Sequence, residues 1–364
     1  MILIIIYIYN INMESLIENV KNKKRYYKNK DGSFMTTGLK GEKKEKPPLS
    51  DKTLKAYEIN FEKIAGDNSL ENLEWLNDTK PIIKKLDGFA KTTKHNILNA
   101  IIVIIQANAP ELKSLDEYIQ LRDILYGNYK KENESGVISE KQAEAFIEKD
   151  EWDKLIKDVE KDFKTKSKLT TISEEEKKRL FQNVLILKLY NELPVRNEFA
   201  SLIKISNEDF KKIPKKERTK NYLVVFKTKM DIYLNDYKTG KTYGEKKFKL
   251  STPLYRLFKI WFKDYNDTNN VFVQQNNEQL TSNNLTKLLN RISQKYLKKN
   301  ISTTMIRKIL MSDKYAEKNE EQKKDANILG HSVNTMNNVY VKKKPEFKTI
   351  KVKKSDLKSD DIPT

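Results

Sequence analysis

The sequence predicts a mainly α-helical protein with one small β-sheet. Along most of the chain, apolar residues recur every three or four positions, the spacing of a helix that buries one face. Between residues 222 and 250, short apolar runs instead alternate with polar residues, which is typical of strands. The length of 364 residues indicates two folded domains with tails.

The composition favours a large anionic partner. The net charge is +20, and 34% of the residues are charged. Such an excess predicts binding to nucleic acid first and to an acidic membrane surface second. Solubility alone, or a lysine-rich coding bias, is the simpler alternative. The sequence has no cysteine, which excludes disulfides and cysteine zinc sites, and its two distant histidines do not favour a metal site.

The first nine residues are strongly apolar but too few to span a bilayer, which takes about 20 residues. They lack the basic start and the small-residue cleavage site of a signal peptide. We interpret residues 1–12 as an upstream mis-start before Met13, with a peripheral anchor or an edge strand as the alternative. No other stretch predicts a transmembrane segment, so no membrane partner is expected.

Residues 1–47 are predicted to form a flexible basic segment, because residues 13–47 offer few core side chains. Between residues 21 and 28, basic side chains interleave with two tyrosines, a pattern that suits a phosphate backbone. The candidate DNA-binding residues are Lys23, Lys24, Arg25 and Lys28. A disordered basic tail without a binding role is an equal alternative.

Residues 48–130 are predicted to form a helical domain. Ser50 caps its first helix, and Gly66 ends that helix. The run 100–105 is apolar on nearly every face, which predicts a buried central helix. The polar residues 131–145 are the expected linker to the next domain.

Residues 146–344 are predicted to form the second domain, and residues 345–364 a basic tail. Ser173 with Glu176 has the pattern of a capping box, and the charge-rich residues 160–170 are expected to form a loop. The expected strands cover residues 222–226, 231–234, 246–250 and 271–273, with a turn at residues 239–241. Further helices are expected to start near residues 252, 281, 302 and 334.

Five residues carry the candidate chemistry, and in chain order they are Arg196, Lys238, Arg307, His331 and Tyr340. Taken singly, each has an ordinary explanation. An arginine beside a core helix can hold a structural carboxylate, and a hairpin lysine can protect a sheet edge. Taken together, these residue types suit one reaction, the attack of a tyrosine hydroxyl on a phosphodiester.

The proposed roles follow from the charges in that reaction. The guanidinium groups of Arg196 and Arg307 can bind the negative charge that builds up on the nonbridging oxygens. A hairpin lysine can protonate the leaving 5′-oxygen as a general acid; Lys238 is preferred, and Lys241 is the alternative. The histidine can position the phosphate and help deprotonate the tyrosine, which becomes a 3′-phosphotyrosyl link. The link conserves the energy of the cut bond, so no cofactor is expected.

This order of residues resembles the tyrosine recombinases, the lambda-integrase-like enzymes that cut and rejoin DNA. Residues 329–331, followed by a tyrosine nine positions after the histidine, are similar to the family's C-terminal signature. The second arginine lies 24 residues before the histidine, close to the usual interval. The hairpin 237–244 is similar to the lysine hairpin in integrases of large DNA viruses and virophages. The resemblance covers roughly residues 145–345.

Two positions depart from the family pattern. Most members have histidine three positions before the second arginine, where this chain has Thr304, and Lys308 also replaces a common histidine. A threonine hydroxyl can hydrogen-bond a phosphate but cannot act as an imidazole. Glu198 stands where the family often has an acidic residue, and the resemblance implies that it orients Arg196.

The resemblance implies a helical, SAM-like core-binding domain and a mixed α/β tyrosine-recombinase catalytic domain, which form a C-shaped clamp on double-stranded DNA. It implies a site-specific recombinase or integrase that acts as a homotetramer on two duplexes, with the C-terminal segment packed on a neighbouring protomer. The alternatives are a catalytically inactive DNA-binding protein of the same fold and a type IB topoisomerase-like enzyme. The composition and motif style favour a virus or mobile element, and hence the host nucleus, a virus factory or a virion.

Overall fold

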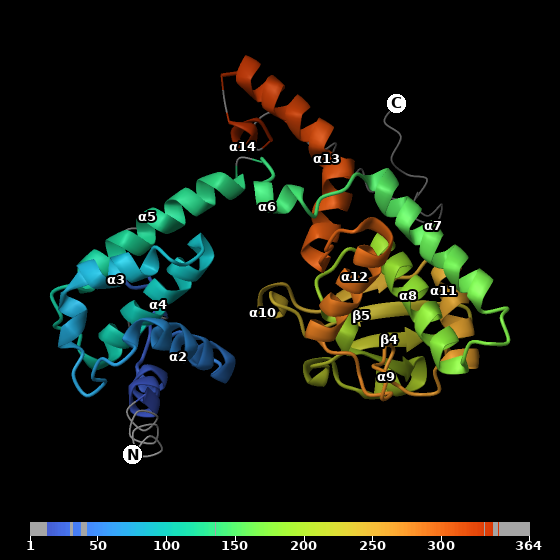
Figure 1. Cartoon of the computed structure of the whole chain (residues 1–364), viewed down its shortest axis with the longest axis horizontal. Coiled ribbons are helices and arrows are strands. Elements are labelled where there is room, and N and C mark those ends of the chain that lie inside the picture. Colours follow the sequence, from blue (N-terminus) through green and yellow to red (C-terminus); the bar gives the residue numbers. More distant parts are fainter. Residues whose placement is uncertain are drawn as a thin grey trace, which may run out of the picture. The chain divides into compact units, whose positions relative to one another are not determined.

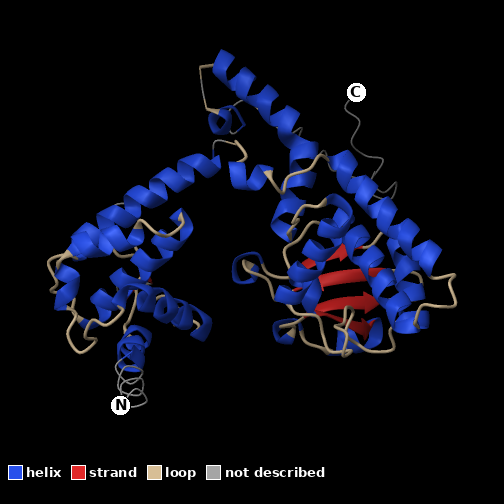
Figure 2. Cartoon of the chain, in the orientation of Figure 1, coloured by secondary structure: helices blue, strands red, loops and turns tan. Residues whose placement is uncertain are grey.

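The computed structural model describes residues 13–29, 32–37, 42–134, 136–330, 332–337 and 341, without the side chains of residues 37, 133 and 141. Figure 1 shows the chain coloured along its sequence, and Figure 2 shows its helices and strands. The chain divides into two compact units between Val137 and Ile138. Helices dominate both units, and a mixed four-stranded sheet lies in the second. The coarse prediction of a mainly α-helical fold with a small sheet is therefore confirmed.

Helices build most of the first unit: α2 (Asp51–Ala65), η1 (Glu74–Asn77), α3 (Thr79–Leu86), α4 (Lys91–Asn108) and α5 (Leu115–Glu134). The central helix is α4, which packs against α2 and α5 and buries seven side chains between Ile97 and Ile105. Neighbours cover α4 on several sides, and this explains its nearly continuous apolar run. The predicted first helix is confirmed, with Ser50 as its N-cap and Gly66 as its C-cap.

The N-terminal segment contains more structure than the sequence predicts. Residues 13–22 form a helix, and its Met13, Leu16 and Val20 lie in the core of the first unit. Their spacing places all three on one helical face. The prediction of a flexible segment therefore does not hold for this helix. Two short antiparallel strands follow it, β1 (Thr36–Thr37) and β2 (Glu42–Lys43). Residues 1–12, interpreted above as a mis-start, lie outside the described residues.

The second unit begins with three helices, α6 (Glu140–Ala143), α7 (Lys149–Lys166) and α8 (Glu174–Glu192). The end of α5 and all of α6 fall within the predicted linker, residues 131–145. The loop predicted for residues 160–170 is wrong in its first part, because α7 continues to Lys166. Ion pairs one turn apart, such as that of Lys164 with Glu160 at 2.9 Å, support this charged last turn. The N-cap of α8 is Ser173, as predicted.

The sheet has the order β3-β4-β5-β6, with strands β3 (Leu202–Ser206), β4 (Asn221–Val225), β5 (Met230–Leu234) and β6 (Lys246–Lys249). The first pair is parallel and the others are antiparallel. The turn η2 (Glu198–Ser201) precedes β3, and α9 (Asn207–Lys212) with η3 (Lys215–Glu217) crosses from β3 to β4. One face of the sheet, with Leu223 and Ile232, joins the main core of the second unit. The other face packs Tyr222 and Tyr233 against Phe210.

The remaining elements are α10 (Gly240–Tyr243), α11 (Thr252–Ile260), the π-helical turn η4 (Trp261–Tyr265), α12 (Ser282–Leu297), α13 (Thr303–Ile328) and α14 (Val333–Thr335). The N-caps of α12 and α13 are Thr281 and Ser302, which agree with the helix starts predicted near residues 281 and 302. The cap of α14 is Ser332, two positions before the start predicted near residue 334. The strand predicted at residues 271–273 is not formed; isolated bridges occur there at Asn270 and Val273. Among the described residues, none of the helices has the length and apolarity to cross a membrane.

Candidate functional site

Arg196 lies in the short segment after α8, and its neighbours hold the backbone in place. The buried Tyr190 donates a hydrogen bond from its hydroxyl to the Arg196 carbonyl oxygen at 2.6 Å. Asn197 donates from Nδ2 to the Ser282 carbonyl oxygen at 3.1 Å and to Thr286 Oγ1 at 3.0 Å. Both acceptors lie near the start of α12, so α8 and α12 together position the segment. The Arg196 side chain itself is exposed.

Arg307 lies in the second turn of α13 and is held from its own helix. Its Nη2 donates a hydrogen bond to Thr304 Oγ1 at 3.1 Å, and its Nε donates to the Thr303 carbonyl oxygen at 3.4 Å. Thr303 Oγ1 in turn donates to Asn197 Oδ1 at 2.8 Å, across 106 residues of sequence. The single side chain of Asn197 therefore links the Arg196 segment to the first turns of both α12 and α13.

The two arginines act on each other electrostatically. The pKa of the Arg307 guanidinium is lowered, first by partial burial and second by the positive charge of Arg196. Glu198 and Tyr190 act in the opposite direction. Within the described part of the chain, neither arginine forms a salt bridge. Two guanidinium groups that act on each other and form no salt bridge with a described residue favour a bound anion, and phosphate oxygens match their hydrogen-bonding geometry.

Glu198 is the acidic group of this region. Its Oε2 atom is buried, and it has no hydrogen-bond partner among the residues that the structure describes. The pKa of the Tyr190 hydroxyl is raised well above its ordinary value, by burial and then by the charge of Glu198. Tyr190 therefore stays neutral as a support for the backbone. The carboxylate acts electrostatically on Arg307, and the idea that it orients Arg196 stays a prediction.

The loop that carries the candidate lysines, residues 235–245, is anchored by one buried asparagine. Asn221 accepts hydrogen bonds at Oδ1 from the backbone amides of Asn235 and Asp236, both at 2.9 Å. Its Nδ2 donates to the Asp236 carbonyl oxygen at 2.9 Å and to the Ser201 hydroxyl at 3.0 Å. Asn221 therefore joins the base of the loop to η2, the turn that directly follows the first arginine segment.

Lys238 and Lys241 are both exposed on this loop. Of the turn predicted at residues 239–241, residue 239 is a turn residue and the N-cap of the one-turn helix α10, and residues 240 and 241 lie within that helix. Glycine is required at position 240, because a Cβ there would lie 2.7 Å from the Asn235 carbonyl oxygen. Both lysines thus stand on a loop with a defined path, and the choice between them as general acid stays a prediction.

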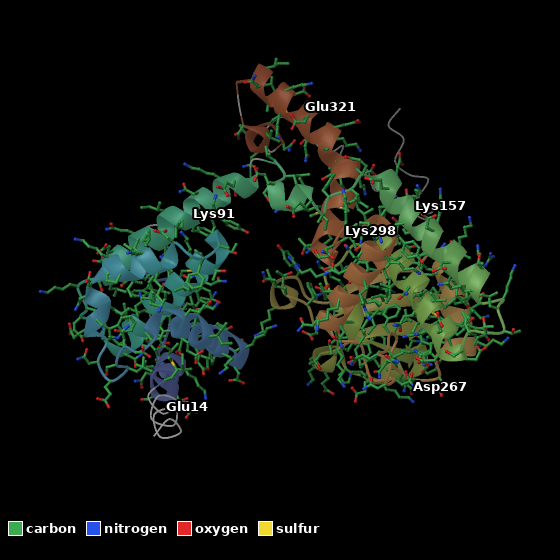
Figure 3. The ribbon with its side chains drawn as sticks, in the orientation of Figure 1. Glu14, Lys91, Lys157, Asp267, Lys298 and Glu321 are labelled. Carbon is green, nitrogen blue, oxygen red and sulfur yellow. The ribbon has the colours of Figure 1, made fainter. Side chains whose placement is uncertain are left out.

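His331 and Tyr340 lie outside the described residues. The helix that leads toward them, α13, runs without interruption from Thr303 to Ile328. At 1.5 Å per residue, it carries the chain roughly 30 Å along its axis between Arg307 and Ile328. Figure 3 shows Glu321 on the far half of this helix, where nearly every side chain is exposed. The described helix therefore ends far from Arg307 along its own axis.

The four candidate DNA-binding residues divide into two pairs. Lys23 donates a hydrogen bond to the Gln106 carbonyl oxygen on α4, and Arg25 donates to the Pro47 carbonyl oxygen at 2.6 Å. These two cations help hold their own segment in place. Lys24 is exposed, and the Lys28 ammonium lies 5.4 Å from the centre of the Phe34 ring. Lys24 and Lys28 can therefore contact a partner while the hydrogen bonds of Lys23 and Arg25 stay in place.

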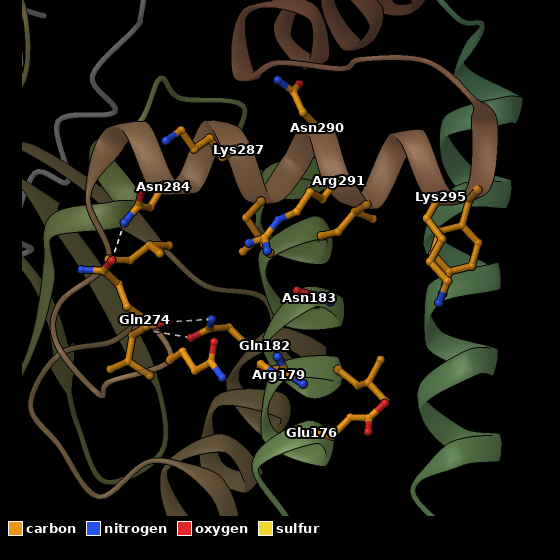
Figure 4. A pocket seen from close by; sticks show the side chains of 17 residues that line it. Glu176, Arg179, Gln182, Asn183, Gln274, Asn284, Lys287, Asn290, Arg291 and Lys295 are labelled. Carbon is orange, nitrogen blue, oxygen red and sulfur yellow. Dashed lines mark hydrogen bonds between the residues drawn. The ribbon is translucent and has the colours of Figure 1, made fainter. Parts of the chain in front are cut away.

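A cavity of about 780 Å³ lies between α8 and α12 (Figure 4). Gln182 closes one wall through two hydrogen bonds with the Val273 backbone, at 3.0 and 2.9 Å. The basic side chains that line the cavity are Arg179, Lys287, Arg291 and Lys295. Sequence reasoning missed this cavity because its walls come from segments about 100 residues apart, and no local pattern marks it.

Asp162 of α7 attaches this region to α12. It accepts hydrogen bonds from Lys295 Nζ at 2.7 Å and from the Tyr296 hydroxyl at 2.6 Å. Burial acts to raise the pKa of the Asp162 carboxyl, but hydrogen bonds from Lys295, Tyr296 and Lys166 outweigh it and lower the pKa to about 2. The ionised carboxylate therefore holds α7 and α12 together.

In the described ranges, no three His, Asp or Glu side chains are grouped so that they could hold a metal ion. No model of a protein family matches the sequence, and no curated protein matches it. The matches among solved structures include the crystal structure of XerA recombinase, with 12% sequence identity and a TM-score of 0.29. That match covers 79% of this chain and 87% of the other. A TM-score this low does not establish a shared fold.

Proposed function

We propose that the chain is a site-specific DNA recombinase that breaks and rejoins strands through a tyrosine. The observation that carries this proposal is the pairing of Arg196 and Arg307. They come from distant segments, act on each other electrostatically and form no salt bridge within the described residues. In a chain of net charge +20, a DNA phosphodiester is the anion that best suits such a pair.

In this proposal, Arg196 and Arg307 hold the nonbridging oxygens and stabilise the charge that develops on them. The hydroxyl of Tyr340 attacks phosphorus, the bond to the 5′-oxygen breaks, and Lys238 protonates that oxygen, with Lys241 as the alternative. His331 positions the phosphate and receives the tyrosine proton. A 5′-hydroxyl from a second strand then reverses the reaction and releases the enzyme. These roles come from the residue types and from the resemblance.

The assembly is also a proposal. The first unit and Lys24 and Lys28 would grip the duplex, and four copies would join two duplexes and exchange strands between them. Residues 345–364 would pack on a neighbouring copy. Size-exclusion chromatography of the chain without residues 345–364, on its DNA site, tests this contact. Assembly and recombination that match those of the full chain would contradict it.

Tyr340 has two routes to an arginine pair, because α13 leads away from Arg307. Either the chain that follows α13 returns to the arginines of its own copy, or the tyrosine enters the site of a neighbouring copy. A mixture of Arg307→Gln and Tyr340→Phe chains separates the two routes. Covalent product from the mixture, when neither variant alone forms it, identifies entry from a neighbour. No product from the mixture identifies attack within one chain.

The test of the function uses a nicked DNA substrate that traps the enzyme after cleavage, built on a site selected from genomic DNA. We expect a denaturant-resistant adduct with the wild-type chain and none with Tyr340→Phe. Equal site binding by both chains is the control for folding. An adduct that survives in Tyr340→Phe would contradict the assignment of the nucleophile.

One observation favours a second function, a DNA-binding protein without catalysis. The hydroxyl of Thr304 accepts a hydrogen bond from Arg307 and is therefore engaged in holding that side chain. No imidazole stands at this position. Specific binding to the selected site without an adduct from either the wild type or Thr304→His would establish this second function and overturn the first.

A further inference from the structure

The function proposed above uses Lys28 of a small sheet near the N-terminus and leaves the aromatic side chains of that sheet without a role. The sheet is built from three antiparallel segments within residues 25–46, called the N-terminal mini-sheet below. The Tyr27 amide donates to the Lys44 carbonyl oxygen at 2.9 Å, and the Met35 amide donates to the Tyr27 carbonyl oxygen at 2.9 Å. The Lys44 amide donates to the Met35 carbonyl oxygen at 2.7 Å, so each segment pairs with the other two. These bonds define a folded element where a flexible tail is predicted.

The aromatic side chains of the mini-sheet do not serve a core. None of its residues belongs to a core cluster among the described residues. Tyr27, Phe34 and Met35 are 37%, 39% and 37% exposed. Successive residues of a strand point to opposite faces, so Tyr26 and Tyr27 place rings on both faces. Large apolar side chains in contact with water on a small sheet indicate a binding surface instead of packing.

Each ring has lysine ammonium groups over it. On one face, Lys43 lies 4.2 Å from the centre of the Phe34 ring and 5.8 Å from that of Tyr26. Lys28 lies 5.4 Å from the same Phe34 ring. On the ring of Tyr27, Lys44 and Lys46 lie at 5.3 and 5.5 Å. None of these four lysines forms a salt bridge with a residue that the structure describes.

We propose that the N-terminal mini-sheet binds single-stranded DNA. A nucleotide in a single strand presents a flat base face and, next to it, a phosphate. An exposed ring with two ammonium groups over it matches both parts: the lysines move from the ring onto the phosphates, and the ring face that they leave stacks on the base. In a duplex the base faces are stacked inside the helix, so a duplex can use the lysines but not the rings.

The choice of DNA rests on the proposed function, because strand exchange leaves strands transiently unpaired. The binding chemistry itself does not depend on Arg196, Arg307 or Tyr340. Arg307→Gln and Tyr340→Phe chains are therefore expected to bind single strands as the wild type does. Failure to form a covalent adduct would therefore count against the proposed function, whereas failure to bind single strands would count against the role of the mini-sheet.

The test measures fluorescence anisotropy of the full chain with labelled 12-nucleotide oligothymidine and with a 12-base-pair duplex, at several salt concentrations. Tyr27→Leu and Phe34→Leu keep an apolar side chain and remove the stacking ring. We expect each to weaken single-strand binding about tenfold, with little change in duplex binding. Phe34→Tyr, which restores a ring, is expected to restore the affinity.

A matched control lies on α13. Tyr315 is 42% exposed, and Lys314 lies 5.2 Å from its ring centre, but it is not part of the mini-sheet. Tyr315→Leu is expected to leave single-strand binding unchanged. Unchanged affinity in both Leu variants of the mini-sheet would overturn the proposal. Equal losses for single strand and duplex would also overturn it, and would identify a phosphate-binding surface without base stacking.

Discussion

The two halves of α13 are held by different forces. In the first half, residues 303–310, the side chains of Met305, Ile306, Ile309 and Leu310 are buried in the core of the second unit. In the second half, residues 311–328, the buried side chain is Ala326. Tertiary packing therefore positions the half that carries Arg307. The other half continues as a helix because its residues favour one and neither glycine nor proline interrupts it.

This difference bears on the proposed mechanism. The arginine pair is held by buried side chains and by Asn197, so its geometry is part of the folded core. The segment with His331 and Tyr340 follows a helical half that has few tertiary contacts. Local openings of low free energy are concentrated in elements of that kind. We therefore expect the arginines to be preorganised and the approach of the tyrosine to be the step that depends on DNA and on neighbouring copies.

The largest expected effect comes from the packed half. Arg307→Gln keeps the approximate shape of the side chain but removes the charge and the bidentate geometry. We expect the rate of adduct formation to fall about 10²–10³-fold, as on loss of one preorganised charge-stabilising donor. Single-turnover cleavage of the nicked substrate measures this rate. Arg256→Gln on α11, an exposed arginine, is the control, and a similar fall in that variant would point to general charge loss instead.

The next effect concerns stability. Ile309→Ala removes a side chain that is 1% exposed and should lower the free energy of unfolding by about 2–5 kcal/mol. Met311→Ala, two positions later and 41% exposed, should change it by less than about 0.5 kcal/mol. Urea unfolding monitored by tryptophan fluorescence compares the two variants. Equal losses would show that the second half of α13 is also packed, and would remove the contrast between the halves.

The smallest effect depends on pH and concerns the contact between α7 and α12. The folded-state pKa of Asp162 is about 2, below its ordinary value of 3.8. Its contribution to stability is therefore complete above the ordinary value and is lost as the pH falls through the folded value. Asp162→Asn should cost about 1 kcal/mol at pH 6. The gap from the wild type in urea unfolding should close as the pH falls from 4 to 2, whereas a constant gap would contradict an ionic role.

Local signals explain most of the agreement between prediction and structure. Ser50, Ser173 and Ser302 cap helices where the sequence predicts them, because a cap and the first turn lie within a few residues of each other. The pairing of segments that are distant in the sequence could not be predicted from such local signals. Strand β3 was not predicted, since it pairs in parallel with β4 across a helical crossover. The mini-sheet also went unrecognised, because its short segments lack a buried face that would give them an apolar pattern.

The sequence by itself determined the residue types of the candidate site, the net charge and the positions of most helices and of strands β4 to β6. These follow from periodicity, capping and composition, which are local properties. Only the tertiary structure decided that Arg196 and Arg307 lie together. Asn197 joins the two arginine segments, and Asn221 joins the lysine loop to η2; the role of neither amide is visible in the sequence. Their hydrogen bonds join residues that are 14 to 106 positions apart in the sequence, and such a bond forms only once folding has brought both segments together.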